Sequence, residues 1–437
     1  MPKNVFVIYY TKENRYSYNA LLGALDSTGV LDSIEVKLYD PKKSDDTIID
    51  ECLSTFDKVV LGISFFTTQV WDTYKEVQRL RRKYGNKLIV IAGGPHPSGE
   101  PQSVLTFGFD YVFVGEGEES INEFFIALNR NDKPLQIPGV YEKNIDGEVW
   151  FEPRKGKIDL NKYLPFSEKV KEVGLGPIEI TRGCPFACHF CQTTSLFGCS
   201  VRHRSISFIE EILDIMKGRN RNDFRAITPN ALAYGSADGK IVNLEEVYSL
   251  LSTIKRSMPN GRIFLGSFPS EVRPEHVTEE SMSLLCEFVA NDNIIMGAQT
   301  GSQRLLDLSH RGHTVSDVYK AVEICVRHNM KPNVDFMFGL PGENSDDVYE
   351  SIIVMKDLIE MGARIHAHTF MPLPQTPFAR KQRGKVNDDI RRMINDINPK
   401  NVREDKKIVY GDWAAQARLS QRIEKLLRTK RVDFTDN

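Results

Sequence analysis

The sequence predicts an α/β protein in which a doubly wound domain is followed by a partial barrel of strand–helix repeats. Three observations predict this class: short continuous apolar runs, helical patterns between them, and turn residues where the runs end. Continuous apolar strands are buried on both faces, as in a parallel sheet covered by helices on each side. At 437 residues the chain is too long for one ordinary core, so two domains and an appendage are expected.

Residues 1–133 carry five apolar runs separated by helical patterns. A pattern rich in lysine, arginine and leucine predicts a helix at 70–84, between the third and fourth runs. This alternation is typical of a Rossmann-like, doubly wound domain, whose ligand binds outside the carboxyl ends of the strands. The runs predict strands at 5–8, 34–36, 59–63, 88–91 and 111–114.

Residues 134–170 are polar and rich in turn residues, so we expect a linker there, with a small hairpin turning at 144–147. From 171 to 378 the alternation resumes, and six strand–helix repeats predict a partial (β/α)6 barrel. Its predicted strands are 178–181, 224–228, 262–265, 294–298, 333–338 and 365–370. Its predicted helices are 206–217, 244–258, 278–288, 315–328 and 346–361.

Residues 379–437 are charged and predict a helical C-terminal extension. Within it, residues 413–430 place alanine, leucine and isoleucine at helical spacing among arginines and lysines. Most amphipathic helices pack on a core, so we expect this helix to cap the barrel. A basic face offered to a partner is the alternative.

The composition is that of a globular protein, with 41% hydrophobic and 27% charged residues. The formal net charge of −2 disfavours nucleic acid as a partner, because nucleic-acid binders usually carry a basic excess. The first residues predict a strand rather than a signal peptide, and no run of about 18 apolar residues predicts a membrane span. Seven cysteines without a disulfide framework favour a reducing compartment, so we expect a cytoplasmic protein.

Three cysteines form the most specific motif of the chain. Cys184, Cys188 and Cys191 follow the first barrel strand with C-x3-C-x2-C spacing. Three thiolates on one loop can hold three irons of a [4Fe–4S] cluster and leave the fourth iron open, as in a catalytic metal site. The alternative is a zinc knuckle completed by Cys199 or His189, although no second CxxC exists.

This motif resembles the signature of the radical S-adenosylmethionine (SAM) enzymes. The resemblance implies an open six-stranded barrel and a cluster whose free iron is chelated by the amino and carboxylate groups of SAM. An electron from the cluster then cleaves SAM to methionine and a 5′-deoxyadenosyl radical. Phe190, the aromatic residue before the third cysteine, is expected near the adenine.

Glycine pairs and hydroxyls follow the third, fourth and fifth strands of the first domain, where a ligand can approach the backbone closely. Their spacing resembles the Ser-x-Leu…Gly-Gly element of cobalamin-binding domains. The resemblance implies that the nucleotide tail of cobalamin enters between these loops; a flavodoxin-like fold that binds flavin or nothing is the alternative. The expected contacts are Ser64, Thr67, Thr68, Gly93, Gly94, Pro95, Gly115, Glu116 and Gly117.

The first domain departs from many cobalamin domains in one respect. Their Asp-x-His-x-x-Gly motif supplies a histidine to cobalt, and here Asn19 stands at about that position. No histidine precedes His96, which we do not count as a ligand. The lower face of cobalt is therefore expected to be empty, bound by water, or approached by Tyr16, Asn19 or Thr68.

Further strand ends resemble SAM contacts of the family. The segment from Gly297 to Thr314 is similar to the G-x-Q-S-G-S…R-G-x-T pattern of radical SAM methylases and methylthiotransferases. The resemblance implies that Gln299 and Ser302 contact the ribose or the carboxylate of SAM, with Arg311 as a carboxylate partner.

Three other strand ends complete the expected SAM site. Gly339 opens a Gly-Leu-Pro-Gly loop expected beside the adenine. Asn230 stands where many family members carry Gly-Gly-Glu, and with main-chain carbonyls it is expected to hold the amino group. Ser267 or Glu271 is expected to meet a ribose hydroxyl.

Together these resemblances imply a class B, cobalamin-dependent radical SAM C-methyltransferase. One SAM methylates cob(I)alamin, and a second supplies the radical that takes hydrogen from an unactivated sp3 carbon. The substrate radical then collects the methyl group from methylcobalamin. The cofactors carry the hard chemistry, and the protein supplies orientation.

The substrate is expected to be a protein or peptide, or else a small molecule. Methylation of a glutamine carbon, as by the enzyme that makes 2-methylglutamine in methyl-coenzyme M reductase, is one candidate. Ferredoxin or flavodoxin is the expected electron donor. A tRNA methylthiotransferase is the first rival, but it would need three more cysteines in the N-terminal domain, which has only Cys52. A non-catalytic cobalamin sensor is the second rival.

Overall fold

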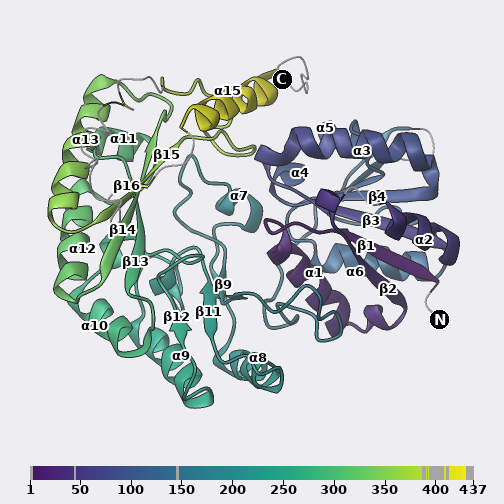
Figure 1. Cartoon of the computed structure of the whole chain (residues 1–437), viewed down its shortest axis with the longest axis horizontal. Helices are drawn as coiled ribbons and strands as arrows, with labels where there is room; N and C mark the ends of the chain where they lie inside the picture. Colours follow the sequence, from purple (N-terminus) through teal and green to yellow (C-terminus); the bar gives the residue numbers. More distant parts are fainter. Residues whose placement is uncertain are drawn as a thin grey trace. The chain divides into compact units, whose positions relative to one another are not determined.

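The computed structural model describes residues 3–43, 46–143, 147–385, 390, 392, 408–409 and 413–429. These residues form two compact units, one reaching to Gly176 and the other running from Pro177 to Thr429 (Figure 1).

The first unit is built on a seven-stranded sheet of order β2-β1-β3-β4-β5-β6-β7. The first five strands in chain order are parallel, which confirms the predicted doubly wound sheet. The strands are β1 (Asn4–Tyr9), β2 (Ile34–Tyr39), β3 (Lys58–Ser64), β4 (Leu88–Gly93), β5 (Tyr111–Phe113), β6 (Val140–Lys143) and β7 (Val149–Trp150). The helices are α1 (Arg15–Ser27), α2 (Thr47–Thr55), α3 (Val70–Tyr84), α4 (Pro95–Gly99), α5 (Pro101–Leu105) and α6 (Glu118–Asn129), with 3-10 turns η1 (Val30–Asp32), η2 (Pro41–Lys43), η3 (Thr67–Gln69) and η4 (Gly85–Lys87).

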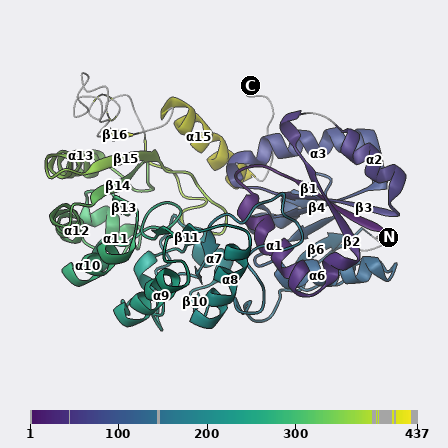
Figure 2. The same cartoon turned by 60° about the horizontal axis from the view of Figure 1, so that its bottom comes forward.

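Helices cover both faces of this sheet, with α1 and α6 on one face and α2 and α3 on the other (Figures 1 and 2). Phe6 of β1 packs edge-on to Tyr18 of α1 and against Phe125 of α6. The central strands are therefore buried on both sides, which is why their sequences read as continuous apolar runs. The chain continues from β1 to β2 on one side and then to β3 on the other side, so the strand order changes direction between β1 and β3. Ligands of such sheets bind at this switch point.

The stretch 134–170, predicted as a linker, is packed into the first unit. Strand β6 pairs antiparallel with β5, and β7 pairs with β6, so the predicted hairpin extends the sheet. The carboxylate of Asp26 accepts hydrogen bonds from the Ser167 hydroxyl at 2.8 Å and the Glu168 amide at 2.7 Å. Part of the polar composition of this stretch thus serves contacts within the unit, which ends at Gly176. Residues 144–146 of the predicted turn lie outside the described residues.

The second unit contains the six predicted barrel strands in two sheets, β12-β11-β8 and β13-β14-β15-β16. Val272, which follows β12 in the chain, forms an isolated parallel bridge with Met296 of β13 and so links the two sheets. The strands are β8 (Ile178–Glu179), β9 (Thr181–Arg182), β10 (Arg202–His203), β11 (Phe224–Ile227), β12 (Ile263–Phe264), β13 (Asn293–Gln299), β14 (Lys331–Phe338), β15 (Arg364–Thr369) and β16 (Ile408–Val409).

Helices of the second unit line the outer side of these strands, as in a partial barrel (Figure 1). Helices α10, α12 and α13 begin where Thr278, Thr314 and Asn344 cap them, each accepting a hydrogen bond from an amide of the first turn. The helices are α7 (Thr193–Phe197), α8 (Ile206–Gly218), α9 (Leu244–Ser257), α10 (Glu279–Phe288), α11 (Gln303–Leu308), α12 (Val315–Arg327), α13 (Ser345–Glu360) and α15 (Trp413–Thr429), with η5 (Ala231–Ala233) and η6 (Pro274–His276).

The C-terminal extension differs in part from its prediction. Helix α15 confirms the predicted helix, and it packs on the barrel: the Ser420 hydroxyl donates to the Phe370 carbonyl at 2.6 Å, and Ile423 is fully buried. However, Ile408–Val409 forms a strand parallel to β15, so the extension is not helical throughout. An open edge of β15 offers unpaired backbone groups, and pairing them favours a strand there. Among the described residues, no helix is both long and apolar enough to cross a membrane.

Candidate functional site

The three cysteines lie on one loop after β9 that the backbone holds at several points. Gly183 has φ +92°, and a Cβ there would lie 2.2 Å from the Ser200 carbonyl, so only glycine fits. The Cys184 amide donates to the Gly198 carbonyl at 3.1 Å. The Cys191 amide donates to the Cys188 carbonyl at 3.0 Å, which turns the loop back between the second and third cysteines. The loop is therefore preformed.

The spacing of the sulfur atoms separates a cluster from a zinc site. Ligands of one tetrahedral zinc lie roughly 3.8 Å apart, because each Zn–S bond is about 2.3 Å. In the part of the chain that the structure describes, only Asp335, His366 and His368 bring three such ligand atoms within 4.8 Å of one another. The three cysteine sulfur atoms therefore do not all lie within 4.8 Å of one another in this structure, whereas the ligands of a single zinc ion would. Cys199 is exposed, and His189 Nδ1 lies 2.9 Å from the Leu308 carbonyl.

The thiols and their surroundings fit an anionic metal cluster. Burial raises the pKa of the Cys184 and Cys191 thiols above the ordinary range, so metal binding must displace their protons. Arg311 Nη1 donates to Cys188 Sγ at 3.7 Å, and its buried Nε has no hydrogen-bond partner. A cluster with three thiolates carries net negative charge, which would compensate this guanidinium.

A second arginine supports the same loop. The Arg273 guanidinium lies 3.4 Å over the centre of the Phe186 ring, and it also donates to the Arg311 carbonyl. Burial lowers the pKa of Arg273, and the charge of Arg311 adds to this, because two guanidinium groups share a recess with Glu275 as the acidic partner. Two guanidinium groups therefore lie near the cysteine loop, and one carboxylate, Glu275, pairs with them.

Phe190 and the Gly339 loop lie together, as the sequence predicts for the two sides of an adenine pocket. Phe190 packs against a buried cluster containing Leu305, Leu340 and Phe378. Gly339 has φ +86°, and its amide donates to Glu343 at 2.5 Å. Burial raises the pKa of Glu343 to about 8, so this carboxyl is neutral at pH 7 and fastens the loop without adding charge.

Gln299 ends β13, Ser267 follows β12, and Arg311 lies on the loop between α11 and α12. Gln299 has φ +72° beside a β-bulge at the end of β13, an uncommon backbone conformation for a residue other than glycine. Arg311 Nη2 donates to the Gly297 carbonyl of this strand at 2.9 Å. The Ser267 hydroxyl is buried without a hydrogen-bond partner. Contacts of these three residues with SAM stay predictions.

Asn230 and Ser302 have protein partners for their side chains. The Asn230 amide group lies 2.8 Å from His276 Nδ1, and its Oδ1 accepts from the Arg273 amide at 3.4 Å. The Ser302 hydroxyl donates to Asp347 at 2.7 Å. Both residues thus brace strand ends in the structure, and their SAM contacts stay predictions.

Sequence reasoning missed a charged group inside the barrel. Asp335 of β14 and His366 and His368 of β15 lie together on the strand faces opposite the buried apolar residues. Glu271, after β12, is reached by solvent but largely surrounded by protein. Burial raises its pKa, and the charge of Asp335 adds to this. The signal was present as polar residues at alternate positions of two otherwise apolar strands.

In the first unit, the predicted cobalamin contacts gather at the carboxyl edge of β3, β4 and β5. Gly94 has φ +95°, and a Cβ there would lie 2.7 Å from the Ser64 hydroxyl. A Cβ at Gly93 would meet only Phe113, at 3.9 Å, so the edge is open there. Asn14 Nδ2 donates to the carbonyls of Tyr9 and Ser64 at 2.9 and 3.1 Å, and so bridges β1 and β3 at the switch point.

The loops at this edge hold one another through neutral groups. His96 is buried, with Nδ1 3.2 Å from the Thr67 hydroxyl, and burial lowers the pKa of His96 to about 4. The Gly115 amide donates to the Ser98 hydroxyl at 2.9 Å. Pro95 is the first residue of α4, and Gly117 directly precedes α6. Glu116 accepts a hydrogen bond from the Ile158 amide at 3.4 Å, and Thr68 is exposed. A neutral, open edge of this kind fits the amide-rich cobalamin.

Tyr16 and Asn19 lie on α1, which follows β1. Asn19 is buried and donates to the Leu175 carbonyl at 3.2 Å, while the Tyr16 hydroxyl accepts from Arg15 at 3.0 Å. No described residue of this unit before His96 is a histidine, so a histidine ligand to cobalt from the β1–α1 loop is absent there. A contact of Tyr16 or Asn19 with cobalt stays a prediction.

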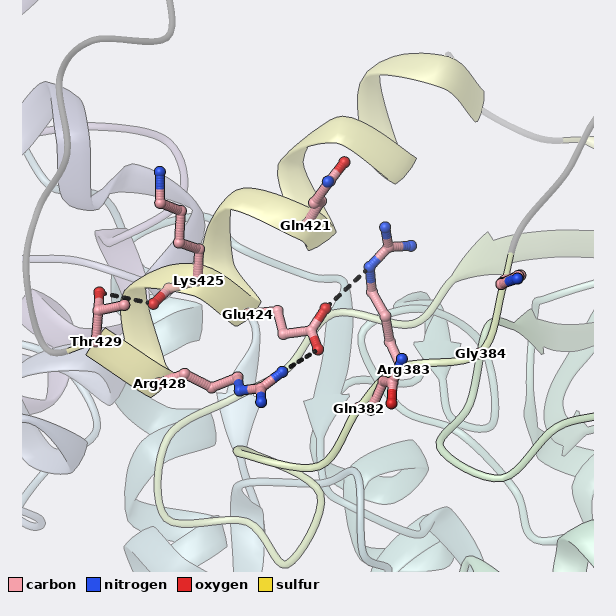
Figure 3. A pocket seen from close by; sticks show the side chains of 9 residues that line it. Gln382, Arg383, Gly384, Gln421, Glu424, Lys425, Arg428 and Thr429 are labelled. Atoms are coloured by element: carbon pink, nitrogen blue, oxygen red, sulfur yellow. Dashed lines mark hydrogen bonds and ion pairs between the residues drawn. The ribbon is translucent and has the colours of Figure 1, made fainter.

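A cavity of about 860 Å³ lies elsewhere in the second unit, between residues 382–385 and the last turns of α15 (Figure 3). Glu424 pairs there with Arg383 at 3.2 Å and with Arg428 at 3.5 Å. None of the predicted site residues lines this cavity. We therefore assign the chemistry to the cysteine loop and the barrel interior.

Comparison with known proteins matches both units to families. Residues 178–353 match the radical SAM superfamily, and residues 15–125 match the B12 binding domain. An uncharacterized methyltransferase of Pyrococcus horikoshii is 25% identical over 343 residues, which are 74% of this chain and 70% of that protein. The bacteriochlorophyllide d C-8(2)-methyltransferase of Chlorobaculum tepidum is 23% identical over 80% of this chain and 73% of its own length.

Among solved structures, the radical SAM methyltransferase TsrM of Kitasatospora setae, with cobalamin and a [4Fe–4S] cluster bound, shares the fold with a TM-score of 0.67. It is 18% identical, and the match covers 87% of this chain and 74% of that chain. The order of the two matched domains in the present chain, B12 binding first and radical SAM second, agrees with the two sites described above. The chain thus combines a B12 binding domain with a radical SAM domain, as cobalamin-dependent radical SAM methyltransferases do, and these two domains imply a [4Fe–4S] cluster, SAM and cobalamin as cofactors.

Proposed function

We propose that this enzyme methylates an unactivated sp3 carbon of its substrate by a radical route. The observation that carries the proposal is the loop of Cys184, Cys188 and Cys191, which lies beside the buried guanidinium of Arg311. When bound, the cluster with SAM supplies a carbon-centred radical, and cobalamin supplies a transferable methyl group.

The side chains of the second unit do the binding work in this proposal. Cys184, Cys188 and Cys191 would hold the cluster, and Arg311 compensates its charge from beside Cys188. Phe190 and the Gly339 loop present an apolar surface suited to an adenine ring. In the first unit, Ser64, Gly93 and Gly94 would hold cobalamin through neutral groups, which leaves its charge and reactivity undisturbed.

The rival methylthiotransferase needs three cysteines in the N-terminal domain for a second cluster. The first unit contains only Cys52, which is buried on α2, so the described residues offer no place for that cluster. This supports methylation over sulfur insertion.

We propose a protein or peptide as substrate, with a glutamine carbon as the first candidate to test. Ferredoxin or flavodoxin in the cytoplasm would supply the low-potential electrons. The polar interior of the barrel, on which Asp335, His366 and His368 lie, gives this proposal its support, because it suits a substrate that carries amide groups.

The test is anaerobic turnover of the reconstituted enzyme with SAM, cobalamin, a low-potential reductant and candidate glutamine peptides. Radical methylation of an sp3 carbon uses two SAM molecules, so 5′-deoxyadenosine and S-adenosylhomocysteine should form in equal amounts with the methylated product. Formation of S-adenosylhomocysteine alone would contradict the radical route. Full radical turnover with a small molecule but none with any peptide would contradict only the substrate.

A further inference from the structure

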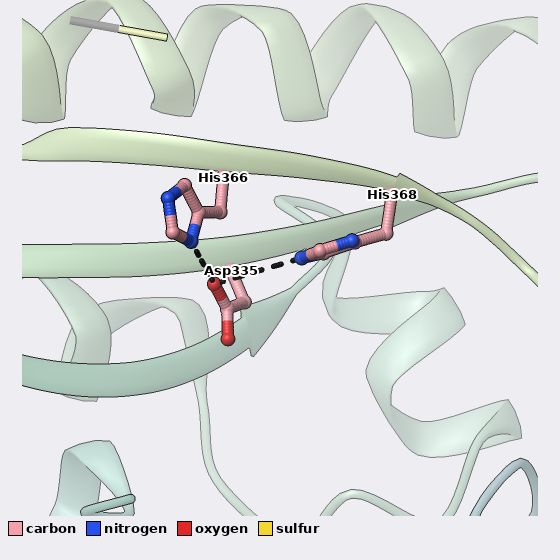
Figure 4. Close-up of side chains that lie close together, drawn as sticks. All are labelled: Asp335, His366 and His368. Carbon is pink, nitrogen blue, oxygen red and sulfur yellow. Dashed lines mark ion pairs between the residues drawn. The ribbon is translucent and has the colours of Figure 1, made fainter. Parts of the chain in front are cut away.

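Three side chains that neither cofactor site uses converge inside the barrel. Asp335 lies on β14 directly opposite His366 of β15 in the parallel register, and His368 follows two residues later on the same face. The alternate residues Val334, Phe336, Ile365 and Ala367 face the other way and are fully buried. Figure 4 shows both imidazole rings directed at the Asp335 carboxylate.

The distances in this group are those of ligands that share a metal ion. His366 Nδ1 lies 3.4 Å and His368 Nε2 lies 3.8 Å from the same oxygen, Asp335 Oδ1. Direct hydrogen bonds would bring these atoms to about 2.7–3.2 Å. Two ligands bound to one ion at about 2.1 Å lie roughly 3.0 Å apart at a right angle and roughly 3.4–3.6 Å apart at tetrahedral to trigonal angles. The observed separations are thus long for hydrogen bonds and close to those of a shared cation.

Besides the two imidazoles, the carboxylate of Asp335 has no charged partner in the described part of the chain. Its Oδ1 is buried without a hydrogen-bond partner. No lysine or arginine pairs with Asp335 among the residues that the structure describes. The group therefore presents a carboxylate and two imidazole nitrogens to one point.

The pair of His328 and Glu279 shows the distance of an ordinary histidine–carboxylate hydrogen bond in the same unit. His328 Nε2 lies 2.8 Å from Glu279, an ordinary hydrogen-bond distance. His366 and His368 share their carboxylate at longer range, and both are reached by solvent, with 39% and 52% of their side chains exposed. This leaves room on the open side of the group for further ligands.

We propose that Asp335, His366 and His368 form a site for one divalent transition metal ion such as zinc, separate from the iron–sulfur cluster. Two imidazoles and one carboxylate are a ligand set that zinc and iron(II) accept, whereas thiolates favour the cluster. Three protein ligands leave a coordination position free. An oxygen or nitrogen donor of the substrate would occupy it, which fixes the substrate inside the barrel.

The test is zinc binding by the anaerobic holoenzyme after dialysis against a chelator mild enough to leave the cluster iron in place. Titration calorimetry and metal analysis should find one zinc per chain. His366→Ala, His368→Ala and Asp335→Asn should each weaken zinc binding by at least about tenfold, because each removes one of three ligands. His328→Ala, which disrupts the control pair, should bind zinc as the unchanged enzyme does.

X-ray absorption at the zinc edge identifies the ligands independently of the variants. Only nitrogen and oxygen neighbours at about 2.0–2.1 Å are expected, and a sulfur neighbour at about 2.3 Å would assign the zinc to the cysteines and overturn the proposal. Absence of zinc binding, or equal affinity in all three variants with cluster iron retained, would overturn it as well. The result does not depend on methylation, so it is separable from the proposed function.

Discussion

The two cofactor edges of this chain are built on opposite electrostatic plans. At the carboxyl edge of the first unit, the Asn14 side chain donates to the Ser64 carbonyl, and the Thr67 hydroxyl pairs with His96. In the barrel, Arg311 Nε, Asp335 Oδ1 and the Ser267 hydroxyl are buried without hydrogen-bond partners. The first edge suits a large neutral ligand recognised by shape, while the second suits charged groups that the protein alone leaves uncompensated. The predictions below test this difference, from the largest expected effect to the smallest.

Cys188→Ala should abolish SAM cleavage, because a cluster held by two cysteines loses its third anchor beside Arg311. Cobalamin binding should persist, since its contacts lie in the other unit. Iron analysis, 5′-deoxyadenosine formation and the cobalamin absorption spectrum measure these outcomes. Cys199→Ala, at an exposed position outside the motif, is the control and should retain both. Loss of cobalamin from Cys188→Ala would mean that the two edges are not independent.

Arg311→Met should lower SAM cleavage by about 10–100-fold, the usual cost of losing an outer partner of a metal ligand. The change removes the guanidinium from both Cys188 and the Gly297 carbonyl. Single-turnover cleavage rates and the midpoint potential of the cluster are the measurements. Arg262→Met, an exposed arginine paired with Asp223, serves as control. An unchanged rate and potential would show that the positive recess is not required.

Gly94→Ala should weaken cobalamin binding and destabilise the first unit by about 1–3 kcal/mol, because it forces a side chain into a left-handed conformation and toward Ser64. Gly85→Ala is the matched control, since Gly85 also has positive φ, +55°, but a Cβ there meets nothing within 4 Å. Cobalamin titration and thermal unfolding separate the two variants. Equal effects would show that backbone strain alone matters, and that the close approach at β4 does not.

Glu343→Gln should change how stability depends on pH between about 4.5 and 8. The folded pKa of Glu343, about 8, is raised above the unfolded value of 4.5, so the folded state binds the extra proton between these values. Stability of the unchanged enzyme should therefore fall as pH rises from about 4.5 to about 8, and the glutamine variant should lose this slope. Melting temperatures at a series of pH values test it. Parallel profiles for the two proteins would rule out a neutral carboxyl at this loop.

His96→Gln should change the acid side instead. The pKa of His96 is lowered by burial from 6.5 to about 4, so the unfolded state binds the extra proton between these values. Stability should fall as pH drops from about 6.5 to about 4, and the variant should be less sensitive there. Thermal unfolding across that range is the measurement. If His96→Gln changed the melting temperature only above pH 6.5, the assignment of a buried, neutral His96 to this edge would be wrong.

Much of the fold was readable because it follows local periodicity. The helix predicted at 70–84 is α3 (Val70–Tyr84), and the six barrel strands lie within a few residues of their predicted positions. The structures of the stretch 134–170 and of the C-terminal extension were harder to predict, because they depend on contacts with distant parts of the chain rather than on local periodicity. Polar residues in 134–170 look solvated in sequence, but Ser167 and Glu168 bond Asp26 from 141 and 142 residues away.

The sequence by itself determined the cysteine loop, the glycine-lined strand ends and the two domain types, because each depends on residues close together in the chain. Only the tertiary structure decided that Asn230 and Ser302 have protein partners, that His96 is buried, and that Asp335 meets two histidines of a neighbouring strand. These facts depend on contacts between distant segments, and pairing between strands sets them through register, which no local pattern of residues encodes.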